Sequence, residues 1–270
     1  VEHLLSVWPG VASRLSRAEH VLLLSDYDGT LTPIVERPEL AAMPGATQTL
    51  LRELARSRRY HIGIISGRAL GDLKARVGLA DVIYAGNHGL EIEGPAFSFI
   101  HPVAAEMKGL LNVLYQVLRR GLGNIRGTLV ENKGLSLSVH YRQVDQDRVP
   151  DVKSAFEQVV ELSRQTGQVR TTEGKKVYEV RPAVDWHKGK AIWAILAHHR
   201  HIRPRVEPTV IFLGDDLTDE DGFKVVRRLG GIAVFVGEKP GSTSAEYYLH
   251  SPYEVREFLS RLVDMERGGM

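Results

Sequence analysis

The chain has 270 residues, of which 43% are hydrophobic and 25% charged, and its formal net charge is +2. This balanced charge gives no electrostatic footprint for binding nucleic acid or an anionic membrane. The chain contains no cysteine, which excludes disulfides, thiol catalysis and cysteine-ligated metal centres. Because the apolar runs are too short to cross a bilayer and the N-terminal segment lacks the pattern of a signal peptide, we expect a cytoplasmic location.

From the N-terminus onward, short aliphatic runs alternate with amphipathic segments. The runs have the length of buried strands: VLLLS (21–25), IGIIS (62–66), VIYAG (82–86), TVIFLG (209–214) and IAVFVG (232–237). Segments with helical periodicity lie between the first three runs, at 46–57 and 69–78. Such alternation is typical of βαβ units, so we predict an α/β fold with a Rossmann-like parallel sheet covered by helices on both faces.

The middle of the chain has a different pattern. Two segments have helical periodicity (104–121 and 148–165), and a third resembles a hairpin (168–182). This block interrupts the alternation described above. We therefore expect an inserted α+β domain over 104–183, between core segments 1–103 and 184–270.

Apolar and polar residues alternate within 127–142. One set is Leu135, Leu137, Val139 and Tyr141, and the other is Ser136, Ser138, His140 and Arg142. This period of two predicts an antiparallel strand with one buried and one wet face.

Polar residues follow three of the predicted core strands, at the point where each strand ends. They are Asp26 and Asp28 in DYDGT, Ser66 and Arg68 in SGR, and Asp215 and Asp219 in GDDLTDED. Lys188 opens the helix that precedes the fourth strand. In an open parallel sheet, ligands bind outside the carboxyl ends of the strands, so we expect these side chains to meet at one edge.

Each of these residues also has a purely structural interpretation. Asp-Gly is a common turn, Ser66 could cap the next helix, and Lys188 could be a solvated lysine. The acidic run 215–221 could favour the start of a helix through its dipole. The convergence of carboxylates, a hydroxyl and a lysine at one sheet edge favours a chemical role.

The chemistry that this set suits is phosphoryl transfer. Asp26, Asp28 and Asp215 supply hard oxygen ligands for Mg²⁺. A carboxylate nucleophile is repelled by an anionic phosphoryl group, and Mg²⁺ together with Lys188 would offset that repulsion. Ser66 could hydrogen-bond a phosphoryl oxygen, and a protonated Asp28 could donate to the leaving alkoxide.

Four motifs resemble those of the haloacid dehalogenase superfamily of phosphatases: DYDGT, ISGR, Lys188 and GDDLTDED. The resemblance implies that Asp26 forms a phosphoaspartate and that Asp28 is the acid/base. It further implies that Ser66 and Lys188 hold the phosphoryl group. The implied ligands of Mg²⁺ are Asp26, the backbone carbonyl of Asp28, and Asp215. Asp219 is implied to support these ligands without binding the metal directly.

Within that superfamily, the chain is similar to trehalose-6-phosphate phosphatases. The similarity lies in YAGNHGLEIE (84–93), LVENKGLSLSVHYR (129–142), EGKKVYEVRP (173–182) and GDDLTDEDGF (214–223). It implies hydrolysis of trehalose 6-phosphate, with the insert acting as a cap. The implied disaccharide contacts are Glu131, Lys133 and Glu179, which without the resemblance would be interpreted as exposed strand charges.

Other residues near the predicted strand ends are further candidates for substrate binding. They are Arg68, Asn87 and His88, although His88 would serve equally well as a structural histidine.

Two alternatives stay open at this point. The same core and cap could serve another sugar phosphate, such as sucrose phosphate or mannosyl-phosphoglycerate. The chain could instead be a non-catalytic sugar-phosphate sensor, although a sensor needs no nucleophile. Because residues 1–20 hold a single amphipathic helix and no glycosyltransferase, we expect a stand-alone phosphatase whose substrate comes from a separate trehalose-6-phosphate synthase.

Overall fold

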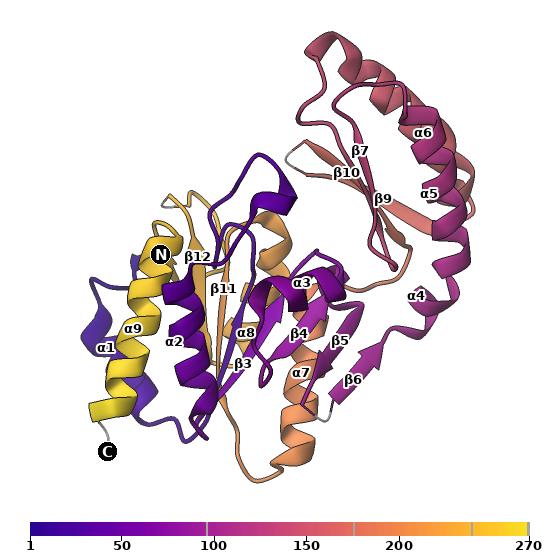
Figure 1. Ribbon diagram of the computed structural model, residues 1–270. Helices are drawn as coiled ribbons and strands as arrows, with labels where there is room; N and C mark the ends of the chain where they lie inside the picture. The colour runs from indigo at the N-terminus through magenta and orange to yellow at the C-terminus, as the bar shows by residue number, and fades with distance from the viewer. Residues whose placement is uncertain (96, 175, 239, 269–270) are drawn as a thin grey trace. The chain divides into compact units, whose positions relative to one another are not determined.

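The computed structural model describes residues 1–95, 97–174, 176–238 and 240–268 (Figure 1). The chain divides into two compact units. The first consists of Val1–Phe99 and Trp186–Met270, and the second is Ile100–Asp185. The insert expected from the sequence, 104–183, lies within the second unit.

A nine-stranded sheet forms the centre of the first unit, in the order β1-β13-β12-β11-β2-β3-β4-β5-β6. In this spatial order, all neighbouring strands from β1 at one edge to β4 are parallel to each other. Strands β4 and β5 are antiparallel. The strands are β1 (Glu2–His3), β2 (Val21–Ser25), β3 (Tyr60–Ile65), β4 (Ile83–Gly86), β5 (Glu91–Gly94), β6 (Phe97–Ile100), β11 (Thr209–Gly214), β12 (Ile232–Val236) and β13 (Tyr247–Leu249).

Helices cover both faces of this sheet because its strands are apolar on both sides. Leu23 of β2 packs with the helices of one face, and Leu22 and Leu24 pack with those of the other. The first face carries α1 (Trp8–Ser16), α2 (Gly45–Arg56), α3 (Leu70–Val77) and α9 (Pro252–Gly268). The opposite face carries α7 (Lys188–Ile202) and α8 (Glu220–Arg228) (Figure 1).

The second unit is a four-stranded antiparallel sheet with helices on one face. The strand order is β7-β8-β10-β9, formed by β7 (Leu129–Asn132), β8 (Leu137–His140), β9 (Val169–Gly174) and β10 (Val177–Pro182). Its helices are α4 (Pro102–Glu106), α5 (Lys108–Leu122) and α6 (Val149–Gln165). Leu118 of α5 and Phe156 of α6 belong to one apolar cluster with Val139 and Val180 of the sheet. The alternate residues of these strands therefore lie on the face without helices.

The parallel sheet and the helices on its two faces confirm the predicted α/β fold. The predicted strands 21–25 and 209–214 coincide with β2 and β11. The predicted helix 104–121 is divided at Met107 into α4 and α5. Strands β5 and β6 were not predicted, because four-residue antiparallel strands at a sheet edge have little periodicity of their own.

The alternating segment 127–142 differs from its prediction in two ways. It contains two strands, β7 and β8, which are separated by a turn where Gly134 has φ +82°. Ser136 and Ser138 are buried, so the predicted wet face is wrong at these two positions. Ser138 pairs with Glu131 on one neighbouring strand and with Glu179 on the other, so long side chains flank its small hydroxyl.

A short 3₁₀ turn, Asn87–Gly89, follows β4 and brings the chain against helix α7. Gly89 has φ +89°, and an added Cβ there would lie 2.2 Å from the Cβ of Ala191 in α7. Both the backbone conformation and the contact require glycine.

We expect Gly89→Ala to lower the free energy of unfolding by about 2–4 kcal/mol, from the left-handed backbone and the overlap with Ala191 combined. Gly71→Ala in α3 is the matched control, because nothing lies within 4 Å of an added Cβ there. The control should be neutral or stabilising by up to about 1 kcal/mol. Urea unfolding followed by circular dichroism measures both, and equal effects would contradict the close approach of the turn to α7.

Candidate active site

The carboxyl end of β2 presents Asp26, which is 5% exposed. Its backbone N–H donates to the carbonyl of Leu213 in β11 at 2.8 Å, so the two strands stay paired up to this residue. The turn that follows is closed by Gly29, whose N–H donates to the Thr32 carbonyl at 2.8 Å. Gly29 has φ +82°, and a Cβ there would lie 2.2 Å from Oδ2 of Asp215. The glycine of DYDGT thus allows its backbone to pack against the carboxylate that follows β11.

Lys188, the first residue of α7, is the buried counter-ion of this edge. Its Nζ lies 2.9 Å from Oδ1 of Asp26 and 2.6 Å from Oδ1 of Asp219. Burial alone would lower the pKa of the ammonium, but the charges of Asp219 and Asp26 raise it well above 10.5. Lys188 therefore remains positively charged at neutral pH.

Asp219 holds the loop after β11 in place. It is fully buried, and its Oδ2 accepts the backbone N–H groups of Asp215 and Asp216, both at 3.1 Å. Since its Oδ1 is bound by Lys188, both oxygens of Asp219 are already used. The carboxyl also lies against Gly214, where an added Cβ would be 2.3 Å from its Cγ.

The electrostatics of this edge suit a divalent cation. One oxygen each of Asp26, Asp215 and Asp219 lies within 4.8 Å of the other two. Burial raises the pKa of Asp26, and Asp215 contributes to the rise, whereas the charge of Lys188 opposes it and favours the ionised carboxylate. Burial would also raise the pKa of Asp216, but Lys188 and hydrogen bonds from Thr218 lower it to about 2. Several carboxylates face a single ammonium, so this edge offers hard oxygen donors with excess negative charge, which fit Mg²⁺. Asp26 and Asp215 could serve as its direct donors.

Asp28 lies apart from that carboxylate cluster and pairs with Arg68. The guanidinium donates from Nε to Oδ2 and from Nη2 to Oδ1 of Asp28, both at 2.7 Å. Its Nη1 donates to Oδ2 of Asp72 at 2.8 Å. This bidentate pair ties the loop after β2 to the loop after β3.

Ser66 follows β3 and is buried. Its backbone carbonyl accepts the N–H of His88 at 2.8 Å, and the Arg68 carbonyl accepts the N–H of Asn87 at 2.8 Å. Asn87 and His88 have φ values of 49° and 59°, an uncommon conformation for residues other than glycine. The His88 ring lies against Gly67, where an added Cβ would be 2.7 Å from its Nε2. Strained backbone of this kind often marks a functional loop.

Three carboxylates that the sequence analysis did not single out support these loops. Asp72 accepts from Arg68, and Glu91 accepts from Nδ2 of Asn87 at 2.8 Å. Asp216 caps the 3₁₀ turn Leu217–Asp219 by accepting the N–H of Thr218. The spacing of four residues between Arg68 and Asp72 was the available signal, because it places both on one side of a helix start.

Two of the three charged residues predicted in the second unit, Glu131 and Glu179, lie on the face of its sheet without helices, and the third, Lys133, follows β7. Glu131 and Glu179 are the register partners of Ser138 from either side. Lys133 Nζ lies 3.4 Å from Oε1 of Glu179, and Arg181 Nη2 lies 3.2 Å from its Oε2. Arg181 was missed in the sequence, although it follows Glu179 by two residues, the spacing that shares a strand face.

Residues 24–253 match the family model described as trehalose-phosphatase. A rice protein named probable trehalose-phosphate phosphatase 4 is 37% identical, over 97% of this chain and 71% of its own length. The C-terminal domain of Candida albicans trehalose-6-phosphate phosphatase has a similar fold, with a TM-score of 0.79 at 24% identity over 95% of this chain and 96% of that chain.

A haloacid dehalogenase-like hydrolase of Bacteroides thetaiotaomicron also shares the fold, with a TM-score of 0.61 at 16% identity, over 90% of this chain and 99% of that chain. These two solved structures therefore share the α/β fold of this chain. The family model covers most of this chain, and the rice relative is 37% identical over 97% of it. The chain therefore belongs to the trehalose-phosphatase family.

Proposed function

We propose that the protein hydrolyses trehalose 6-phosphate to trehalose and inorganic phosphate, with Asp26 as the nucleophile. The observation that carries this proposal is the buried Asp26, which lies between Lys188 and the carboxylate of Asp215 in a member of the trehalose-phosphatase family. A carboxylate so placed has one oxygen bound to an ammonium and faces a cluster suited to a cation. This is the environment in which it can approach an anionic phosphoryl group.

In the first step, a carboxylate oxygen of Asp26 attacks the phosphorus, and the ester P–O bond breaks. The leaving oxygen of trehalose takes a proton from Asp28. In the second step, a water molecule attacks the phosphorus of the phosphoaspartate and gives a proton to Asp28. The bond between phosphorus and Asp26 breaks, so that phosphate is released and Asp26 is restored. Ser66 and Lys188 hold the phosphoryl oxygens. Asp26, the Asp28 carbonyl and Asp215 would hold Mg²⁺, which would supply electrostatic stabilisation of the transferring group.

The pairing of Asp28 with Arg68 places a condition on this mechanism. A carboxylate that accepts two hydrogen bonds from a guanidinium has no proton to donate. Arg68 must therefore release Asp28 when substrate binds, and the freed guanidinium is then available to an anionic substrate. This exchange accounts for both roles, Asp28 as acid and Arg68 as a substrate-binding residue.

In the second unit, we propose that Glu131, Lys133 and Glu179 bind the sugar hydroxyls. Support comes from the position of Glu131 and Glu179 on the face without helices and from the ion pair of Lys133 with Glu179. Their opposite charges suit neutral hydroxyls as both donors and acceptors. Asn87 and His88 remain proposed contacts to the substrate. A separate trehalose-6-phosphate synthase and a cytoplasmic location stay predictions. Among the described residues, the structure contains no helix with the length and apolarity needed to cross a membrane.

We expect Asp26→Asn to abolish turnover, because an amide cannot form the acyl phosphate. Asp28→Asn should slow the reaction by about 10²–10⁴-fold, the usual loss for a general acid–base. Phosphate release from trehalose 6-phosphate measures both variants, with circular dichroism as the control for folding. Substantial turnover by purified Asp26→Asn would rule out the covalent mechanism.

Chelation should stop activity, and added Mg²⁺ should restore it. Ca²⁺ should inhibit, because its longer bonds and looser geometry misplace the nucleophile relative to phosphorus. Asp215→Asn should raise the Mg²⁺ concentration that gives half-maximal activity, whereas Asp221→Asn, outside the carboxylate cluster, should leave it unchanged. Full activity in excess chelator would contradict the assigned metal site.

Alanine at Glu131, Lys133 or Glu179 should lower kcat/KM for trehalose 6-phosphate by about 10–100-fold, since hydrogen bonds to charged groups contribute about 1.5–3 kcal/mol. Hydrolysis of p-nitrophenyl phosphate, which lacks the sugar, should change little. Lys153→Ala, an exposed charge on α6, is the matched control and should affect neither substrate.

Equal losses on both substrates would assign these three residues to folding or general catalysis. Sucrose 6-phosphate and glucose 6-phosphate belong in the same assay. Faster hydrolysis of either by the wild-type protein would favour the alternative of another sugar phosphate.

A further inference from the structure

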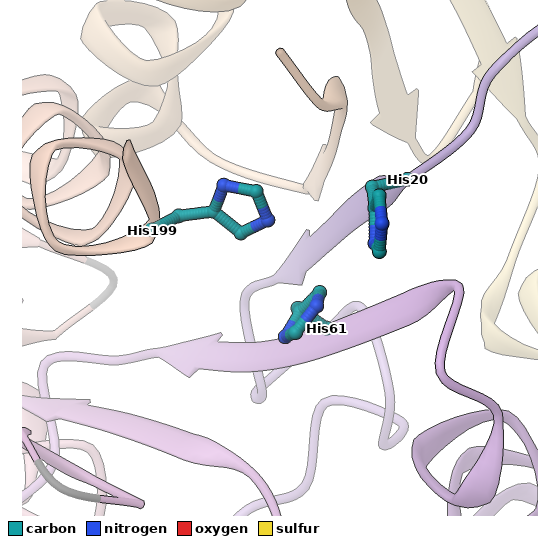
Figure 2. Close-up of side chains that lie close together, drawn as sticks. All are labelled: His20, His61 and His199. Carbon is teal, nitrogen blue, oxygen red and sulfur yellow. The ribbon is translucent and has the colours of Figure 1, made fainter. Parts of the chain in front are cut away.

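Three histidines converge at the amino-end edge of the core sheet. His20 directly precedes β2, His61 is the second residue of β3, and His199 lies near the C-terminal end of α7. Their rings face a common space (Figure 2), with centroid distances of 5.8 Å for His20–His61, 6.0 Å for His20–His199 and 4.9 Å for His61–His199. We call these three residues the histidine cluster.

The histidine cluster is distant from the active site. His20 precedes β2 and Asp26 follows it, so the two are separated by the full length of the strand, about 20 Å at the usual rise of about 3.3 Å per residue. In the same way, His61 and Ser66 lie at opposite ends of β3. The cluster therefore cannot contact a phosphoryl group bound at the carboxyl ends of these strands.

Several ring nitrogens of the cluster are buried without a hydrogen-bond partner among the described residues. These atoms are Nδ1 of His20, Nε2 of His61, and both Nδ1 and Nε2 of His199. His20 is 7% exposed and His199 is 3% exposed, so water reaches them poorly. Each unsatisfied buried polar atom costs about 1–3 kcal/mol. Packing alone does not explain three polar rings at one point.

Burial and neighbouring positive charges favour the neutral form of two rings in the cluster, those of His61 and His199. Burial lowers the pKa of His61 to about 4, with further lowering by His199 and Arg203. Burial also lowers the pKa of His199, helped by His20 and Arg203 and opposed by Glu207. A neutral imidazole has a nitrogen lone pair that can bind a metal ion.

We propose that His20, His61 and His199 bind a divalent transition-metal ion, for which Zn²⁺ is the best match. One ring nitrogen of each residue lies within 4.8 Å of the other two. A tetrahedral Zn²⁺ with bonds of about 2.0–2.1 Å holds its nitrogen ligands about 3.3 Å apart, so each ring has to move inward by less than about 1 Å. Three protein ligands leave a fourth position for water.

Two neighbouring charged residues bear on such a site. Arg203 Nη1 lies 3.3 Å from Nε2 of His20 and would turn outward to solvent when a cation binds. Arg203 is only half-buried, so this movement leaves no charge stranded in the core. Glu207 contributes a negative charge near His199, although Arg200 pairs with it at 2.5 and 3.0 Å.

The choice of ion follows from the donor atoms. Imidazole nitrogen suits Zn²⁺ and other late first-row ions, whereas Mg²⁺ prefers oxygen. The histidine cluster and the acidic cluster therefore select different metals in the same unit. A bound ion would join β2, β3 and α7 and so act as a structural link rather than a catalytic group.

The test is a titration of the metal-free full chain with Zn²⁺ against a chromogenic chelator, with saturating Mg²⁺ present to occupy the acidic cluster. We expect one Zn²⁺ per chain. His20→Gln, His61→Gln and His199→Gln should each weaken Zn²⁺ binding by more than roughly 100-fold, since even losing an outer partner of a ligand costs about 10–100-fold. His201→Gln, an exposed histidine on the same helix, is the matched control and should bind Zn²⁺ as wild type does.

Two further measurements test Zn²⁺ binding even if some of the variants fail to fold. Zn²⁺ should raise the Tm of the wild-type chain and of His201→Gln but not that of His61→Gln, whose ring is the least buried of the three. X-ray absorption of the Zn²⁺-loaded wild-type chain should show nitrogen ligands at about 2.0–2.1 Å. Absence of a bound Zn²⁺ under saturating Mg²⁺, wild-type affinity in all three variants, or coordination by oxygen alone would overturn the proposal.

Discussion

The buried ion network of Lys188 with Asp26 and Asp219 is the constraint on which the core depends. Removing a charge from water costs several kcal/mol per ion, so each buried carboxylate requires the ammonium beside it. That requirement fixes the start of α7 against the ends of β2 and β11. Glycine allows the start of α7 to pack this closely. At Gly189, an added Cβ would lie 2.6 Å from the carbonyl oxygen of Asp221.

The groups proposed to contact the substrate have ionic partners within the protein in this structure. Arg68 holds Asp28 by two hydrogen bonds, and Glu179 lies between Lys133 and Arg181. A ligand has to replace these internal partners, which reduces the net binding energy. The same exchange favours selectivity, because a ligand that breaks the pairs without matching them leaves charged groups unpaired.

The sequence predicts the features that are local in the chain. Aliphatic runs locate β2 and β11, and the polar residues that follow them locate the site edge, since parallel strands place their carboxyl ends together. Features that depend on distant partners were not predictable. The Arg68–Asp28 pair joins residues 40 positions apart, the burial of Ser138 depends on its neighbours in two other strands, and His199 meets His20 only through the crossover of α7.

In β2, β3 and α7, a residue of the histidine cluster lies at or near one end of the element, and a residue of the candidate active site lies at the other end. β2 separates His20 from Asp26, β3 separates His61 from Ser66, and α7 begins at Lys188 and reaches His199 near its end. Because the two strands and the fifteen-residue helix α7 are stiff, restraining one end of each element also restrains the orientation of its other end. The Lys188 network already fixes the site edge, so linking the opposite edge adds mainly to the stability of the core. Any coupling between an ion at the histidine cluster and a ligand at the acidic cluster is reciprocal, because each restrains the same three elements.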